Sequence, residues 1–338
     1  MHVTQAIISG FWLMKSQFTL ESFDSIYDDW KKLHRNSPTA PIFSSSEWSK
    51  IWWQQFGSGA KLHIGAVRQG GKIIGIAPLL LNGDVASFIG SSDVCDYLDF
   101  VVAPGSEDSF FKELLDNLKA EGILRLDLAT LLPDSTVRTS LVNIAPKQKW
   151  QVSCSPEDVT VELHLPSSWE DYLELLSGKQ RHELNRKLRR LNEEGDLNHR
   201  TSTDANQHDV DIFVQLFRDS RQDKAAFLTP QMESFFRAVA HAMAGQKLLR
   251  LNILELDKKP VAATMCFDYR DTVYLYNSGY EPDYGWLSVG VISKALCIKD
   301  SIERHKKRFD FLKGDESYKY HLGGQELPLY KCSLSYTA

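Results

Sequence analysis

The sequence predicts an α/β protein with a mixed (α+β) sheet, built from two similar units in tandem. One observation is length, because 338 residues exceed what a single ordinary hydrophobic core supports. Another is that short β-like runs alternate with segments of helical periodicity along the whole chain. The same order of elements also occurs twice: helices, a hairpin, a strand, a helix and a strand.

The first unit is expected at residues 1–160. Its clearest signal is the Gly70-Gly71 pair between two β-like runs, because both glycines tolerate the positive φ of a tight hairpin turn. Pro104 and Gly122 mark the ends of a strand and of a helix. The expected elements are helices at 20–34 and 45–56, a hairpin of 62–67 with 72–81, a strand at 99–102, a helix at 108–121 and a strand at 123–129.

The second unit is expected at residues 161–338. Ser177 and Gln180 form a capping-box pattern at the start of a basic helix, in which three leucines share one face. The expected elements are helices at 167–177, 179–194, 209–224 and 230–245, strands at 248–256, 261–269 and 272–280, a helix at 288–305 and a strand at 309–312.

Composition indicates a soluble globular protein, with 43% hydrophobic and 25% charged residues. The formal net charge of -5 argues against a general nucleic-acid binder. Five scattered cysteines without a C-x-x-C spacing favour free, mostly buried thiols in a reducing compartment over a disulfide framework. Residues 1–17 lack a signal-peptide pattern, and the longest apolar run is too short to span a bilayer. We therefore expect a cytoplasmic protein, with association at the inner membrane face left open.

Four stretches of the chain resemble a known group of transferases; they are 41–48, 177–191, 276–280 and 309–319. The element order resembles the GNAT N-acyltransferase fold, and two such units in tandem resemble the FemAB-type aminoacyltransferases. Closer still is the resemblance to the CelD-like acetyltransferases associated with cellulose biosynthesis. This resemblance implies a tandem GNAT fold, acyl transfer, coenzyme A as the donor and an active site in the second unit, beside a degenerate first unit.

The candidate catalytic residues follow the strand at 309–312. Glu316 is the preferred general base and Asp315 the second choice, because partial burial raises the pKa of a carboxylate. Tyr318 would give a proton to the leaving group, and Lys319 would bind an anion or stabilise developing negative charge. The alternative is a charged turn in which Asp315 caps the chain reversal and Lys319 is solvated or ion-paired.

The GNAT arrangement implies a donor held between splayed strands, expected here as 261–269 and 272–280. Backbone N–H groups at the start of the following helix suit phosphate, although the usual glycine-rich pyrophosphate loop is absent. Polar groups at the strand end would contact donor or acceptor, unless they only satisfy the strand's own hydrogen bonds. The residues expected at the helix start are Ser288, Val289 and Gly290, and those at the strand end are Asn277, Ser278 and Tyr280.

The basic helix offers a further binding surface. Arg181 and Arg186 are expected to meet a phosphorylated donor, a lipid- or nucleotide-linked sugar, or an anionic membrane contacted through Lys179–Arg190; the alternative is a solvated helix face. The tryptophans at 48, 52 and 53 have helical spacing, which favours core packing over sugar stacking. The histidines form no metal-ligand spacing, so we predict no metal.

The resemblance implies a function: transfer of an acyl group, expected to be acetyl, from a coenzyme A thioester to an amine or hydroxyl. The acceptor would be a small molecule such as a sugar, or a cell-envelope or polysaccharide precursor. Two alternatives stay open. One is a non-catalytic binding or scaffold component of polysaccharide biosynthesis, and the other is a FemAB-like transferase that uses aminoacyl-tRNA.

Overall fold

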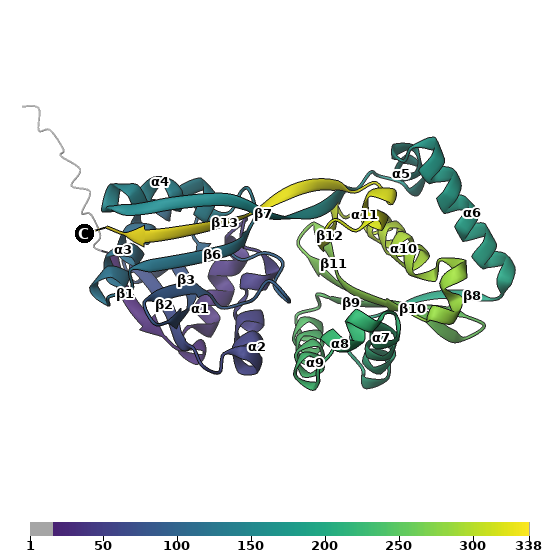
Figure 1. Ribbon diagram of the computed structural model, residues 1–338, viewed down its shortest axis with the longest axis horizontal. Helices are drawn as coiled ribbons and strands as arrows, with labels where there is room; N and C mark the ends of the chain where they lie inside the picture. The colour runs from purple at the N-terminus through teal and green to yellow at the C-terminus, as the bar shows by residue number, and fades with distance from the viewer. Residues whose placement is uncertain (1–15, 338) are drawn as a thin grey trace, which may run out of the picture.

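The computed structural model describes residues 16–337, whose strands form one continuous mixed sheet (Figure 1). The elements of the first half are β1 (Ser16–Glu21), α1 (Phe23–Asn36), α2 (Ser46–Phe56), β2 (Lys61–Gln69), β3 (Lys72–Asn82), β4 (Val85–Phe88), β5 (Val101–Val102), α3 (Glu107–Ala120), β6 (Arg125–Leu131), α4 (Val142–Ile144) and β7 (Trp150–His164). Those of the second half are α5 (Trp169–Leu175), α6 (Gly178–Glu194), β8 (Leu197–Ser202), α7 (Gln207–Asp219), α8 (Gln222–Phe227), α9 (Pro230–Gly245), β9 (Leu249–Leu256), β10 (Lys259–Tyr269), β11 (Thr272–Tyr280), α10 (Val289–Glu303), β12 (Arg308–Lys313), α11 (Ser317–His321) and β13 (Gln325–Tyr336).

The two halves repeat one pattern of strand pairing. In each half, helices follow the first strand, and three antiparallel strands come next. A helix then connects to a strand that runs parallel to the previous one: β4 pairs with β6, and β11 pairs with β12. The order across the sheet is β1-β2-β3-β4-β6-β13-β7-β12-β11-β10-β9-β8, with β5 beside β3.

The long strands β7 and β13 connect the halves by an exchange. Strand β7 ends the first half but pairs with β12, whereas β13 ends the second half and pairs with β6. The two strands also pair with each other over most of their length, so each half completes the sheet of the other (Figure 1). The boundary expected at residue 160 falls inside β7 and stays a prediction.

Neither β7 nor β13 is among the strands expected from the sequence. Much of β7 is exposed or half-buried on both faces, so its sequence lacks the alternation that marks a strand with one buried side. Cys154 and Cys332 lie directly opposite each other on these strands and form a disulfide, although they are 178 residues apart in the chain. The expectation of five free thiols is therefore wrong for this pair, while Cys95, Cys266 and Cys297 are free and buried.

Local chemistry explains where several helices begin. Residues 20 and 21, expected in the first helix, belong to strand β1, because Ser22 caps α1 through a reciprocal side-chain and backbone bond with Ser25. The expected capping box of Ser177 and Gln180 is confirmed at the start of α6. The helix expected at 209–224 is divided into α7 and α8.

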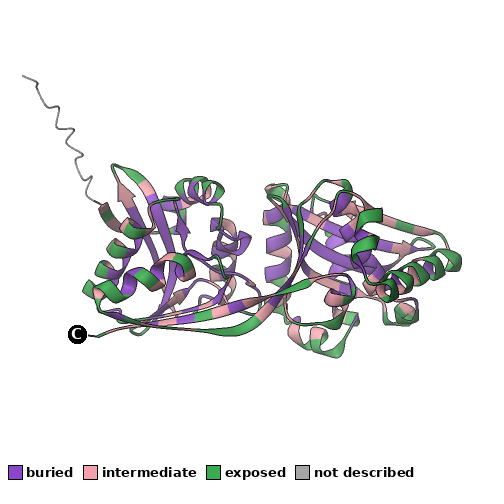
Figure 2. Cartoon of the chain, turned by 90° about the horizontal axis from the view of Figure 1, so that it is seen from above, coloured by how far each residue is buried: buried purple, intermediate pink, exposed green. Residues whose placement is uncertain are grey.

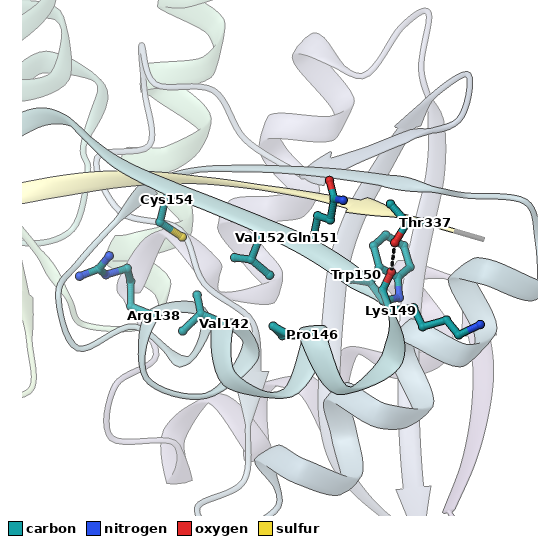
Figure 3. Close-up of a pocket in the computed structure, with 9 residues that line it drawn as sticks. All are labelled: Arg138, Val142, Pro146, Lys149, Trp150, Gln151, Val152, Cys154 and Thr337. Carbon is teal, nitrogen blue, oxygen red and sulfur yellow. Dashed lines mark hydrogen bonds between the residues drawn. The ribbon is translucent and has the colours of Figure 1, made fainter.

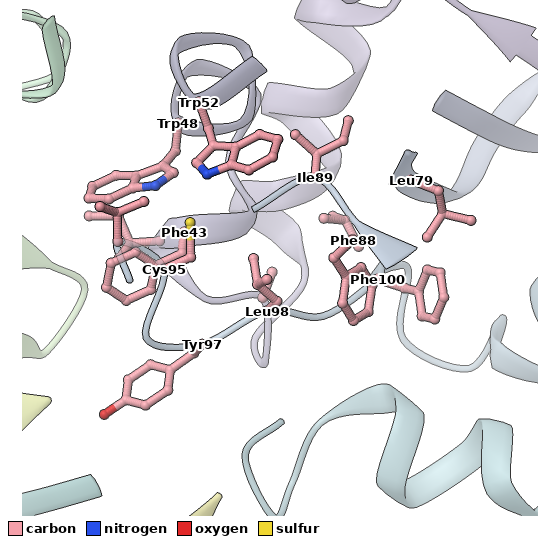
Figure 4. Close-up of a cluster of buried hydrophobic side chains, with 14 of the residues drawn as sticks. Phe43, Trp48, Trp52, Leu79, Phe88, Ile89, Cys95, Tyr97, Leu98 and Phe100 are labelled. Carbon is pink, nitrogen blue, oxygen red and sulfur yellow. The ribbon is translucent and has the colours of Figure 1, made fainter. Parts of the chain in front are cut away.

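The cores are aromatic-rich and lie on the strands and inner helix faces of both halves (Figure 2). Trp48 and Trp52 are buried and Trp53 is half-buried against them, which confirms that they pack in the core. Trp48 makes an edge contact with Tyr276 of the second half at 5.2 Å between ring centroids. At the border of this cluster, the hydroxyl of Tyr97 points away from the apolar side chains (Figure 4). Aromatic packing thus joins the halves beside the sheet.

Candidate functional site

The site is built where the parallel strands β11 and β12 separate. They pair only from Thr272↔Arg308 to Tyr274↔Asp310 and then diverge. The strands expected to splay, at 261–269 and 272–280, instead pair along their whole length, so that prediction is wrong. The divergence opens into a cleft of about 650 Å³. Its lining includes Ser92, Asp93, Asp96, Arg221, Lys224, Asn277, Ser278, Tyr280, Ser288, Gly290, Lys294, Glu316, Tyr318 and Lys319.

A strained turn ends β12 at the cleft. Leu312 has a φ of 63°, which is uncommon for a side chain with a Cβ, and the β12–β7 register shifts between Asp310 and Lys313. Three contacts hold the turn: the Leu312 N–H donates to the Asp310 carboxylate at 2.8 Å, the Lys313 N–H to Asp96 at 3.1 Å, and the Gly314 N–H to a β7 carbonyl at 2.9 Å. The turn is therefore fixed by both halves of the chain.

The side chain of Lys319 also holds the turn that ends β12. This side chain is buried, and Nζ donates to the carbonyl oxygens of Leu312 at 2.7 Å, Lys313 at 2.7 Å and Gly314 at 3.0 Å. The Glu316 carboxylate lies 2.9 Å away. An ammonium has three N–H donors, so internal partners use all of them. The catalytic role expected for Lys319 stays a prediction. In the structure its ammonium holds the three carbonyl groups of the turn, and we call this arrangement a structural clamp.

The two predicted carboxylates differ in position. Glu316 lines the cleft with about half of its side chain exposed, and Asp315 is exposed outside the cleft lining. Burial acts to raise the pKa of Glu316, but the ammonium of Lys319 outweighs it and the pKa is lowered. The expectation that the pKa of Glu316 is raised is therefore wrong. The cause is the ion pair with Lys319, and the sequence does not show that these two residues pair.

Tyr318 and Lys294 form the inner wall of the cleft. Burial, and then the charge of Glu316, raise the pKa of Tyr318, so its phenol stays protonated at neutral pH. Lys294 Nζ lies 4.8 Å from the centre of the Tyr318 ring and donates to the Gly290 carbonyl at 2.9 Å. Burial, and then the charge of Lys224, lower the pKa of Lys294 to about 8. The sequence analysis missed Lys294, which sits in a helix with no distinguishing pattern.

The start of α10 borders the cleft at the position expected for a phosphate. Ser288 has a φ of 60° and precedes the helix, Val289 is buried in the core, and Gly290 faces the cleft against the ring of Tyr280. The first N–H groups of a helix lack partners within it. The Ser288 carbonyl accepts from Val291 and Ile292, and Val289 is fully buried outside the cleft lining, so the N–H group of Gly290 is the one left to meet an anion in the cleft. A phosphate at this position would meet fewer amides than a glycine-rich loop offers.

Polar groups at the end of β11 line the opposite wall, where Asn277, Ser278 and Tyr280 all reach the cleft. Lys224 of α8 donates to the Ser278 carbonyl and also lines the cleft. Burial, and then the charge of Arg221, lower the pKa of Lys224 to about 8. Sequence reasoning placed Lys224 only at the end of a helix and gave it no role.

The first half contributes Ser92, Asp93 and Asp96 to the cleft. Burial raises the pKa of Asp96 despite its bond from the Lys313 N–H. Tyr97 donates to the Asp310 carboxylate at 2.8 Å, and burial raises the pKa of Asp310 to about 7. These contacts depend on the packing of the two halves, so no local pattern in the sequence could have identified them.

Two other predicted residues lie outside the cleft. Arg181 and Arg186 are exposed on α6 and do not line it. Arg186 makes two bonds of 2.8 Å to Glu183 on the same helix.

A larger hollow of about 780 Å³ lies on the first half, between β7 and the helical segment before it (Figure 3). Its charged lining residues are Arg138 and Lys149, no carboxylate lines it, and neither β11 nor β12 contributes to it. We therefore place the site at β11 and β12. Within residues 16–337, no group of three or more His, Cys, Asp or Glu side chains could hold a metal ion. No helix in this same range is both long and apolar enough to cross a bilayer.

Comparisons with known proteins agree with this geometry. Residues 178–320 match the acetyltransferase (GNAT) domain family. The fold is similar to the crystal structure of FemX, with a TM-score of 0.65, 11% identity, and coverage of 93% of this chain and 96% of that one. It is also similar to the C-terminal domain of a protein assigned as a lysylphosphatidylglycerol synthetase of Agrobacterium fabrum, with a TM-score of 0.59, 10% identity, and coverage of 93% and 92%. None of the curated protein sequences matches the chain.

The predicted tandem GNAT fold is confirmed by the domain match, by the FemX-like arrangement over most of the chain and by the repeated strand pairing. The domain match indicates a GNAT-type transferase over residues 178–320, whereas the likeness to FemX, at 11% identity, shows the fold alone. The narrower CelD-like assignment stays a prediction.

Proposed function

We propose that the protein transfers an acyl group, acetyl in the simplest case, from a coenzyme A thioester to an amine or hydroxyl. The observation that carries the proposal is the divergence of β11 and β12 into a cleft bordered by the start of α10. An acyl-pantetheine arm would enter between the strands, and its pyrophosphate would lie at the start of α10, against the N–H group of Gly290. The acceptor proposed is a sugar or a cell-envelope or polysaccharide precursor, on family resemblance alone.

The chemistry needs a base for the acceptor and an acid for the leaving thiolate. The raised pKa of Asp96 makes it a better base than Glu316, whose carboxylate is paired with Lys319. Tyr318 is a buried neutral phenol and is suited to give a proton to the thiolate. Lys294 lies beside Tyr318 and would balance negative charge that develops there.

Calorimetric titration with acetyl-coenzyme A tests the donor. We expect binding that is lost in Gly290→Asp, because a Cβ there would lie 3.1 Å from the Tyr280 ring and the added carboxylate would repel phosphate. Gly245→Asp is the matched control, since a Cβ at that helical glycine meets nothing within 4 Å. A folded wild type that binds no acetyl-coenzyme A at millimolar concentration would refute the donor and favour the scaffold or aminoacyl-tRNA alternatives.

Turnover of acetyl-coenzyme A with candidate amines and sugars tests which carboxylate acts as the base. Asp96→Asn is expected to lose activity while Glu316→Gln retains most of it. The reverse result would restore Glu316 as the base.

A further inference from the structure

A second cavity lies beside the cleft, on the outer side of the second half. It has a volume of about 580 Å³, within the range of pockets that hold small ligands, and is lined by residues of α6, the start of α10 and the α11 segment. Figure 1 labels these three helices. We call this cavity the α6 groove. Its lining residues are Ser177, Lys179, Gln180, Glu183, Leu184, Lys187, Val291, Tyr318, His321 and Leu322.

The α6 groove and the cleft share two walls. Val291 and Tyr318 line both cavities, and Gly290, the residue before Val291, lines the cleft. A ligand whose phosphates lie against Gly290 at the start of α10 is therefore at the junction between the two spaces. The part of that ligand beyond the phosphates would extend into the α6 groove.

The charge in the α6 groove favours an anion. Lys179 and Lys187 are eight residues apart on one helix, about two turns, so they share a face. Glu183 lies between them, but its two carboxylate oxygens accept the bonds of Arg186 at 2.8 Å, whereas Lys187 Nζ is 3.6 Å away. Only 24% of the Lys187 side chain is exposed, which holds its ammonium near the groove. The net result is a positive site on the groove wall.

The floor of the α6 groove suits a flat ring more than a long chain. Leu184 and Leu322 are buried, and the half-buried Tyr318 lies between the two cavities. Together with Val291 these side chains offer one apolar surface, and the remaining lining residues are polar or charged. A purine ring covers such a surface, whereas an extended acyl chain would need an apolar path that the lining does not supply.

We propose that the α6 groove binds the phosphorylated adenosine end of the donor, with Lys179 and Lys187 contacting its 3′-phosphate. This inference rests on the proposed use of a coenzyme A thioester. It gives a specific role to the face of α6 that carries these two lysines. The expectation from the sequence is that Arg181 and Arg186 contact the ligand. The α6 groove would then fix the distal end of the donor while β11 and β12 hold the thioester.

The test compares coenzyme A with dephospho-coenzyme A, which lacks the 3′-phosphate, by calorimetry. We expect the wild type to bind coenzyme A about tenfold more tightly, from the usual strength of bonds to charged groups. The double variant Lys179→Ala/Lys187→Ala should lose this preference and bind dephospho-coenzyme A as the wild type does. Arg189→Ala/Arg190→Ala is the matched control, because both arginines are exposed on α6 outside the groove lining, and it should retain the preference.

The outcomes separate the two proposals. Equal wild-type affinity for both ligands, or a preference that survives in the lysine double variant, overturns the α6 groove site while binding that is lost in Gly290→Asp still supports the proposed donor. If the folded wild type binds neither ligand, the proposed function is refuted and the groove inference with it.

Discussion

Replacement of Lys319 by methionine distinguishes a structural clamp from a catalytic group. Methionine keeps the apolar stem of the side chain but removes the ammonium. The carbonyl oxygens of Leu312, Lys313 and Gly314 then lose donors at 2.7, 2.7 and 3.0 Å, and the turn at the cleft loses its support. Each buried acceptor left without a partner costs about 1–3 kcal/mol, and loss of one member of a buried charged network costs about 3–5 kcal/mol.

We therefore expect Lys319→Met to lower the free energy of unfolding by about 3–4 kcal/mol. The ion pair with the half-exposed Glu316 adds little, so Glu316→Gln, which keeps all three carbonyl bonds, should cost less than about 1 kcal/mol. Equilibrium unfolding in urea, followed by tryptophan fluorescence, measures both changes. A Lys319→Met protein as stable as Glu316→Gln but without transferase activity would refute the clamp and make Lys319 a catalytic residue.

Three further predictions follow from buried contacts. Burial raises the pKa of Asp310 from 3.8 to about 7. The contribution of Asp310 to stability is therefore complete below about pH 4 and is lost as the pH rises through about 7. In urea unfolding, the free energy of unfolding of Asp310→Asn should decline less than that of the wild type between about pH 4 and pH 7. Gly279→Ala should destabilise the fold by roughly 3 kcal/mol, because a Cβ there would lie 2.2 Å from a backbone nitrogen of α7. Gly178→Ala should stabilise α6 slightly, because a Cβ there meets no atom within 4 Å, and thermal melts of both variants measure the two changes. Mass spectrometry after alkylation of the denatured, unreduced protein should count three modified cysteines, rising to five after reduction, and five without reduction would contradict the Cys154–Cys332 pair.

Elements whose causes are local can be read from the amino-acid sequence. The Gly70-Gly71 turn forms the expected hairpin, because glycine adopts positive φ without cost. Ser177 and Gln180 start α6 through bonds only three residues apart. The run of polar residues after β12 was recognised as a candidate site, since Glu316 lies at a strand end within a stretch that resembles known transferases.

The contacts between residues far apart in the chain depend on the folded arrangement. The exchange of β7 and β13 depends on strand register across the sheet, and a strand such as β7, much of which lacks a buried face, specifies its register only weakly. The same packing places Asp96 of the first half against the end of β12 and places Lys294 beside the phenol of Tyr318. Burial and neighbouring charge set the pKa of each of these groups, and both are properties of the folded arrangement. The composition of the cleft therefore follows from long-range packing, whereas the elements that carry it follow from local sequence.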